Sequence, residues 1–116
     1  RALLRVDVLR RQMELFFDDY DLLLTPTMAV TAFPIEDRPS FIGGKEVEPF
    51  WGFLPFTFPI NMTGQTASSI PCGFSADGLP IGLHIIGRHG AEALVLQASA
   101  AFEEARPWIQ KRPVVS

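Results

Sequence analysis

The sequence predicts an α/β fold in which the strands of a mixed β-sheet are flanked by helices. Two apolar runs, 67–72 and 80–87, flank Asp77-Gly78, a dipeptide that suits turn positions with positive φ. The second run is mostly apolar on both of its alternating faces, so we expect a strand that is covered on both sides. Amphipathic spacing over 2–19 and 91–105 predicts two helices that could provide this cover.

The first predicted helix has one apolar stripe. Its members recur at intervals of three and four residues: Ala2, Val6, Leu9, Met13, Phe16 and Tyr20. Arg10 and Glu14 are spaced for an i,i+4 ion pair on the polar side. No capping residue precedes the pattern, so we expect a helix that begins in the middle of a longer element. A short buried strand over 20–25 should follow and stop at Pro26.

The segment 28–48 is irregular and predicts a long surface loop punctuated by Pro34, Pro39 and Gly43-Gly44. The two glycines precede Lys45, but the spacing of a phosphate-binding loop and a preceding strand are both missing. We therefore predict no nucleotide site in this loop.

Composition excludes several classes of function. The net charge of −3, with no basic cluster, argues against a nucleic-acid partner. Prolines interrupt the most apolar region, so no membrane-spanning run is predicted, and a single cysteine favours a reducing, cytoplasmic location. A mean hydropathy of +0.19 is high for a domain of 116 residues, which suggests part of a larger protein.

Five short motifs occur in a characteristic order. They are Asp21-Leu22-Leu23-Leu24-Thr25-Pro26-Thr27, Asn61-Met62-Thr63-Gly64-Gln65, Ser69-Ile70-Pro71-Cys72-Gly73, Gly78-Leu79-Pro80-Ile81-Gly82-Leu83, and Ala101-Phe102-Glu103 followed by Pro107-Trp108. The motifs are spread over residues 21–108, which is most of the chain. In this order they resemble the C-terminal part of amidase-signature enzymes. The chain departs from the family pattern at Thr66, where a proline is usual, and at His84, where glutamine is more frequent.

This resemblance implies hydrolysis of a carboxamide to a carboxylic acid and ammonia, through an acyl-enzyme and without a metal or organic cofactor. The family uses a Ser nucleophile, a second Ser in a cis peptide and a Lys base, all in its N-terminal half. Neither Lys45 nor Lys111 has a matching context, and Ser68-Ser69 lacks flanking glycines. We therefore expect residues 1–116 to be the C-terminal fragment of a single amidase domain, with the N-terminal catalytic portion absent and no catalytic residue in this chain.

The aromatic-rich segment 50–59 has two interpretations. Aromatic side chains are usually core residues, but they also line apolar ligand pockets. The resemblance, carried over by position, indicates that Leu54, Thr57 and Phe58 bind the acyl group, with Trp51 and Phe53 as neighbours. The many Phe and Trp residues of this segment favour small, neutral, apolar or aromatic amides as substrates.

Two alternatives remain open. Cys72 and His84 could form a thiol–imidazole pair, although a buried cysteine and an internally hydrogen-bonded strand histidine are expected instead. The chain could also be a non-catalytic subunit or interaction module that pairs with a separate catalytic half, as in an amidotransferase. Its apolar faces predict either self-association or pairing with the missing N-terminal portion.

Overall fold

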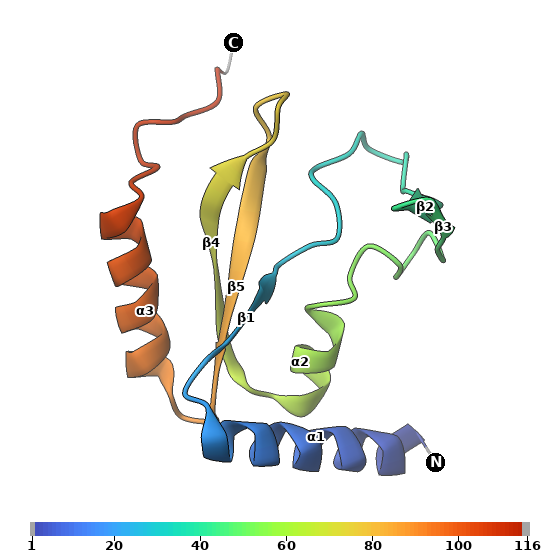
Figure 1. Cartoon of the computed structure of the whole chain (residues 1–116). Coiled ribbons are helices and arrows are strands. Elements are labelled where there is room, and N and C mark those ends of the chain that lie inside the picture. The colour runs from blue at the N-terminus through green and yellow to red at the C-terminus, as the bar shows by residue number, and fades with distance from the viewer. Residues whose placement is uncertain (1, 115–116) are drawn as a thin grey trace.

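The computed structural model describes residues 2–114 and confirms an α/β fold (Figure 1). The elements in chain order are α1 (Ala2–Asp19), β1 (Leu23–Pro26), β2 (Phe41–Ile42), β3 (Lys45–Glu46), α2 (Phe58–Thr63), β4 (Thr66–Phe74), β5 (Pro80–Gly87) and α3 (Glu92–Ala105). A three-stranded sheet has the order β1-β5-β4, and both of its pairings are antiparallel, so the predicted mixture of parallel and antiparallel pairs is not seen within residues 2–114. Helix α1 crosses one end of this sheet, whereas α3 runs alongside it (Figure 1).

The hairpin of β4 and β5 is the predicted one. Its strands extend beyond the predicted 68–72 and 81–87, and Asp77-Gly78 lies in the turn between them. Gly78 has φ 83°, as the turn requires, and the Ser75 hydroxyl donates to the Asp77 carboxylate. This hydrogen bond lowers the pKa of Asp77. A bulge between Pro71 and Gly73 interrupts the pairing near the turn.

The central strand β5 carries the core. Ile85 and Ile86 point to opposite faces and are only 2% and 0% exposed. Ile86 packs with Phe17 of α1 and Ile60 of α2, and Met13, Phe16 and Leu23 surround this cluster. On the other face, α3 contributes the buried Val95. The expected two-sided cover is confirmed at this end of β5, whereas Ile81 at the opposite end is 39% exposed.

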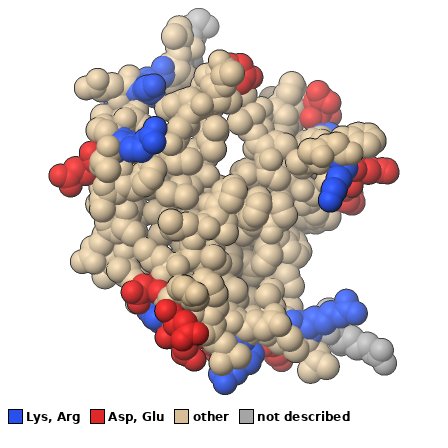
Figure 2. Space-filling model, viewed as in Figure 1, with Lys and Arg blue, Asp and Glu red and all other residues tan. Residues whose placement is uncertain are grey.

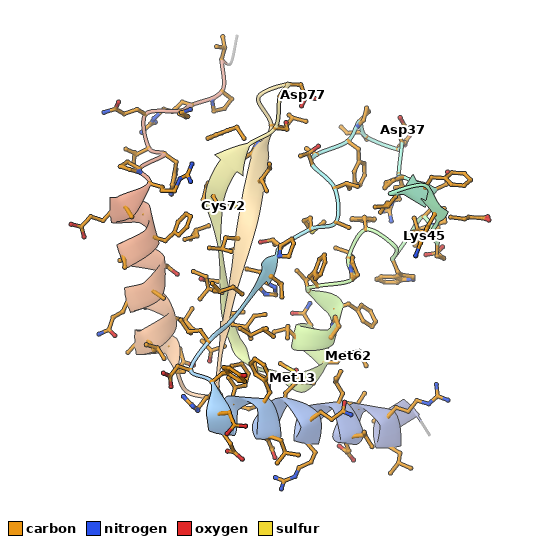
Figure 3. The ribbon with its side chains drawn as sticks, viewed as in Figure 1. Met13, Asp37, Lys45, Met62, Cys72 and Asp77 are labelled. Atoms are coloured by element: carbon orange, nitrogen blue, oxygen red, sulfur yellow. The ribbon has the colours of Figure 1, made fainter. Side chains whose placement is uncertain are left out.

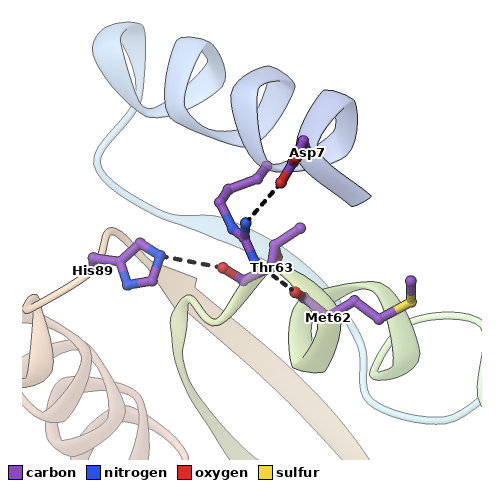
Figure 4. Close-up of polar contacts among 5 residues, drawn as sticks. Asp7, Met62, Thr63 and His89 are labelled. Carbon is purple, nitrogen blue, oxygen red and sulfur yellow. Dashed lines mark hydrogen bonds and ion pairs between the residues drawn. The ribbon is translucent and has the colours of Figure 1, made fainter. Parts of the chain in front are cut away.

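Helix α1 has the predicted bounds, but its ion pairs differ. Arg10 pairs with Asp7 at 3.0 Å, and Glu14 pairs with Arg11 at 3.2 Å. The predicted Arg10–Glu14 pair is therefore wrong. The guanidinium of Arg10 also donates to the Met62 carbonyl of α2 at 3.5 Å, so the group that pairs with Asp7 also joins α1 to α2 (Figure 4).

The C-terminal end of α1 is held by Arg88, which follows β5. Its guanidinium donates to the carbonyl of Phe17 and, at 3.2 Å, to that of Tyr20, and it lies 3.4 Å from the Asp21 carboxylate. The last carbonyls of a helix have no partner within the helix and carry partial negative charge. Arg88 satisfies two such groups and joins the helix to the sheet. Tyr20, predicted within the apolar stripe, is 59% exposed and stacks on Phe16.

Strand β1 lies at an edge of the sheet and begins three residues later than the predicted strand. The Thr27 amide donates to the Gly82 carbonyl at 3.0 Å and continues the pairing beyond Pro26. The predicted loop contains one unpredicted feature, the β2–β3 hairpin. Gly43 and Gly44, with φ 57° and 78°, form its turn. Two-residue strands are too short to produce a recognisable alternation.

We predict that Gly78→Ala destabilises the protein that carries this chain by about 1–2 kcal/mol, because a Cβ is strained in the left-handed region. Gly73→Ala is the matched control, since a Cβ meets no atom within 4 Å at either position and only Gly78 has a positive φ. Urea unfolding curves of both variants test this. Equal stabilities of the two variants would contradict the assigned turn.

Candidate functional site

A hollow of about 740 Å³ opens on the face of the sheet that carries Ile86, beyond the core cluster and toward the hairpin turn. Three segments line it: 27–33 after β1, Phe53, and the outer parts of β4 and β5. The lining residues are Thr27, Met28, Ala29, Val30, Thr31, Ala32, Phe33, Phe53, Ser69, Ile70, Pro71, Pro80, Ile81 and Gly82. The Ala29 amide donates to the Phe53 carbonyl at 3.4 Å and thereby joins two of these segments.

The floor of the hollow depends on a glycine. The Thr27 and Ser69 hydroxyl oxygens are 2.7 Å apart and share a hydrogen bond across Gly82. A Cβ at Gly82 would lie 2.7 Å from the Thr27 oxygen and 2.9 Å from the Ser69 oxygen. Only glycine therefore permits this close approach of the two hydroxyls.

The aromatic wall of the hollow is formed by Phe33 and Phe53. Their ring centroids are 5.1 Å apart at an interplanar angle of 81°, an edge-to-face arrangement. Behind this pair, the Arg38 guanidinium lies 4.7 Å from the Phe50 centroid and 5.9 Å from the Phe53 centroid. The Glu48 carboxylate accepts hydrogen bonds from the backbone amides of Phe50 and Trp51, both at 2.8 Å. These contacts fix the segment that presents Phe53.

The lining of this hollow is uncharged, since none of the described residues that form it is ionisable. In the view of Figure 2, the lysine, arginine, aspartate and glutamate side chains lie around the periphery of the molecule, and the surface between them is uncharged. A group that enters the hollow meets apolar side chains and the hydroxyls of Thr27, Thr31 and Ser69. The site is therefore suited to an uncharged ligand.

Of the five residues that the sequence indicated for substrate binding, Phe53 lines the hollow. Trp51 and Phe58 are 61% and 46% exposed and pack edge to face at 5.9 Å. Leu54 and Thr57 are partly buried, and their carbonyls accept the first amides of α2, from Phe58 and Asn61. These four residues lie outside the described hollow, and their contact with substrate stays a prediction.

The sequence did not indicate the segment 27–33 as part of a site, and its residues 28–33 were predicted to belong to the irregular surface loop 28–48. One signal was available, since the run from Leu22 to Ile35 contains no charged residue. An exposed loop of this length normally carries charges, so their absence was an indication of a buried or ligand-facing segment.

His84 lies on the same face of β5, between Ile86 and Gly82, and is 5% exposed. Its Nδ1 shares a hydrogen bond with the Thr25 hydroxyl at 3.2 Å, which confirms the expected internally bonded histidine. Burial lowers the pKa of His84. The residue opposite His84 on β4 is Ser69, whereas Cys72 lies at the bulge. The register therefore gives no support to a thiol–imidazole pair.

The other candidate groups are dispersed. Figure 3 shows Lys45 on the β2–β3 hairpin, away from the sheet that carries Cys72. Within residues 2–114, no group of three His, Cys, Asp or Glu side chains is arranged to hold a metal ion. None of the helices in the same range is long and apolar enough to cross a membrane.

A smaller, charged hollow of about 280 Å³ lies between α1, the residue before β4 and the segment after β5. Glu14, Asp18, Gln65, Arg88 and His89 line it together with Phe17. His89 Nε2 is 3.2 Å from the Thr63 carbonyl (Figure 4), and the Thr63 hydroxyl donates to Gln65. These bonds connect the end of α2 to the segment after β5, which indicates a structural role.

We predict a pH-dependent contribution of His84 to stability. Because its pKa is lowered by burial, the unfolded chain binds the proton more readily than the folded one. The free energy of unfolding should therefore fall as the pH decreases below the ordinary histidine pKa of about 6.5, and this loss is absent above it. His84→Gln should remove this part of the pH dependence, as measured by urea unfolding at several pH values.

His89→Gln is the matched control, because it removes the other histidine of the chain. An identical pH dependence in the wild type and in His84→Gln would show that the environment of His84 does not disfavour its protonated form.

Comparisons with known proteins agree with this geometry. The family model described as Amidase matches residues 1–96. An acylamidase from Rhodococcus erythropolis is 45% identical over 103 residues, which are 87% of this chain and 21% of that protein. A glutamyl-tRNA(Gln) amidotransferase subunit from Moorella thermoacetica is 45% identical over 108 residues, which are 91% of this chain and 20% of that protein.

Solved structures give the same result. The crystal structure of a bacterial aryl acylamidase of the amidase signature family superposes with a TM-score of 0.83 and 38% identity, over 96% of this chain and 24% of that one. The structure of 6-aminohexanoate cyclic dimer hydrolase gives a TM-score of 0.81 and 34% identity, over 93% of this chain and 24% of that one. The chain spans about a fifth of the length of the curated relatives that it matches. It belongs to the amidase signature family.

Proposed function

We propose that this chain is the C-terminal part of an amidase-signature amidohydrolase that converts a carboxamide and water into a carboxylic acid and ammonia. The observation that carries this proposal is the uncharged hollow, on a chain whose family includes an acylamidase and a cyclic dimer hydrolase. The expected Ser-Ser-Lys constellation has no counterpart in the sequence of this chain. In this proposal the nucleophile and the base come from a preceding part of the same domain.

The role of this chain is to bind and orient the amide. Apolar contacts position the carbonyl carbon for attack by the serine, and positioning of this kind accounts for a large part of enzymatic rate acceleration. The attack forms an acyl-enzyme and releases ammonia, and water then hydrolyses the ester to the acid. Phe53 supports the proposed acyl-binding segment because it lines the hollow. Leu54, Thr57, Phe58 and Trp51 are proposed to extend this surface once the remaining part of the domain covers them.

The proposed partner of the chain is the catalytic portion of the domain. Large apolar side chains are exposed along α1 and on the aromatic segment, with Leu3 80%, Leu4 68% and Trp51 61% exposed. Surfaces of this kind are normally covered in soluble proteins. Without that partner, the isolated chain is expected to self-associate. We also propose a cytoplasmic location, with neither nucleic acid nor membrane as a partner, on the basis of charge and cysteine content.

The 45% identity to an amidotransferase component favours one alternative function. In that case the chain is part of a subunit that works together with further proteins. Purification of the longer protein at its natural expression level distinguishes the two possibilities. A subunit should be recovered together with further proteins, whereas an amidase that acts by itself should be recovered alone. An amidase that acts by itself should hydrolyse simple amides in the absence of other subunits.

We predict that a polypeptide of residues 1–116 releases no ammonia from simple aliphatic or aromatic amides, because it lacks the nucleophile and the base. The longer protein that carries this chain should release ammonia from the same amides. Ammonia release by the isolated chain, retained after replacement of Ser68, Ser69 and Cys72 by alanine, would reveal a nucleophile elsewhere in this chain. Absence of release from both polypeptides would contradict the proposed function.

We further predict that Phe58→Ala in the longer protein shifts its preference toward bulkier amides. The lost ring volume enlarges the proposed acyl site, where each methylene is worth about 1–3 kcal/mol of discrimination. The ratio of kcat/KM values for long and short amides measures this shift. Leu3→Ala is the control, since Leu3 is also exposed but lies on α1. An equal loss for all amides, together with a lower Tm, would assign Phe58 to the core.

A further inference from the structure

We infer that Phe33 and Phe53 are specificity-determining residues that select an uncharged aromatic group in the hollow, and that Arg38 is the positioning residue for this pair. The inference rests on the proposed function for the identity of the ligand as an amide. It narrows the expected small, neutral, apolar or aromatic amides to those with an uncharged aromatic group and names the residues that select this group. Phe33 and Arg38 were not among the residues that the sequence indicated.

The first argument is the chemistry of the lining. Within the described part of the chain, no lysine, arginine, histidine, aspartate or glutamate is among the residues that surround the hollow. Two of its three hydroxyls, those of Thr27 and Ser69, already bond to each other at 2.7 Å. A charged group that entered would lose its hydration and find no counter-ion among the described residues of this chain, which is unfavourable. The part of the lining that this chain provides therefore disfavours charge and offers few polar contacts.

The second argument is the geometry of the two rings. Phe33 and Phe53 meet edge to face, so the edge of one ring points at the face of the other. Aromatic rings prefer edge-to-face and offset arrangements, which contribute about 0.5–1.5 kcal/mol beyond the burial of area. A further aromatic ring could extend this arrangement inside the hollow. A small aliphatic group would gain only the burial of its own area.

The third argument concerns how the pair is held in place. Arg38 lies outside the hollow, with its guanidinium 5.9 Å from the centroid of Phe53 and 4.7 Å from that of Phe50. It also donates to the Phe50 carbonyl at 3.5 Å. A cation near an aromatic ring is attracted by the negative face of that ring. Arg38 therefore restricts the orientation of Phe53 without contacting the ligand.

The test is equilibrium binding to the longer protein that carries this chain, with its proposed nucleophilic serine replaced by alanine so that the ligands are not hydrolysed, measured by isothermal titration calorimetry. The ligands are benzamide, acetamide, 4-methylbenzamide and 4-(aminomethyl)benzamide, of which the last two differ mainly in charge. Benzamide should bind at least about tenfold more tightly than acetamide, and the neutral methyl compound at least about tenfold more tightly than its cationic counterpart. Equal affinities within either pair would overturn the inference.

Variants assign the preference to residues. Phe33→Ala and Phe53→Ala should each reduce the benzamide-to-acetamide affinity ratio by about tenfold, and Phe53→Leu, which retains more volume, by less. Arg38→Gln should weaken binding of benzamide and raise its KM, with a smaller effect on acetamide, so that the benzamide-to-acetamide affinity ratio falls. The matched control is Arg5→Gln, on the exposed side of α1. An unchanged ratio in both alanine variants would overturn the assignment.

Binding and hydrolysis are separated by an ammonia assay on the unmodified longer protein with the same amides. Selective binding of benzamide without ammonia release would contradict the proposed function and leave the inference standing. Ammonia release without any preference between benzamide and acetamide would support the proposed function and overturn the inference.

Discussion

The burial of β5 on both of its faces is the constraint on which the other contacts depend. Ile86 joins α1 and α2 to the sheet through Phe17 and Ile60, while Ile85 faces the side on which α3 contributes Val95. Both isoleucines lie at one end of the strand, so the helices gather there. The opposite end of the same strand, at Gly82 and Ile81, borders the uncharged hollow. One strand thus provides both the core and part of the proposed site.

His84 marks the boundary between these two regions. On the same face, Ile86 belongs to the core cluster and Gly82 begins the floor of the hollow, with His84 between them. The polar groups in this row bond to one another, His84 to Thr25 and Ser69 to Thr27. Each bond connects neighbouring segments of the sheet through side chains, in addition to the backbone pairing. For His84, which is 5% exposed, the bond to Thr25 offsets part of the desolvation cost of burying a polar ring.

The sequence was sufficient for the elements with strong periodic signals. The α1 helix, the β4–β5 hairpin and the internally bonded His84 follow from amphipathic spacing, turn chemistry and local pairing. The hollow could not be predicted in the same way, because Phe33, Phe53 and Gly82 come from three distant segments that only the tertiary fold brings together. The prediction of an Arg10–Glu14 pair was wrong for a related reason. Arg10 interacts with Asp7 and with the carbonyl of Met62, a residue remote in sequence that only the tertiary fold brings close.

Pro26 has a consequence for how this sheet can grow. The Thr27 amide points inward to Gly82, so the alternation of an antiparallel strand directs position 26 outward, along the open edge of β1. Proline has no amide hydrogen, and an incoming strand would find one donor fewer at that point. A strand added along this edge would therefore form one backbone hydrogen bond fewer opposite Pro26, next to the point where Thr27 begins the lining of the hollow.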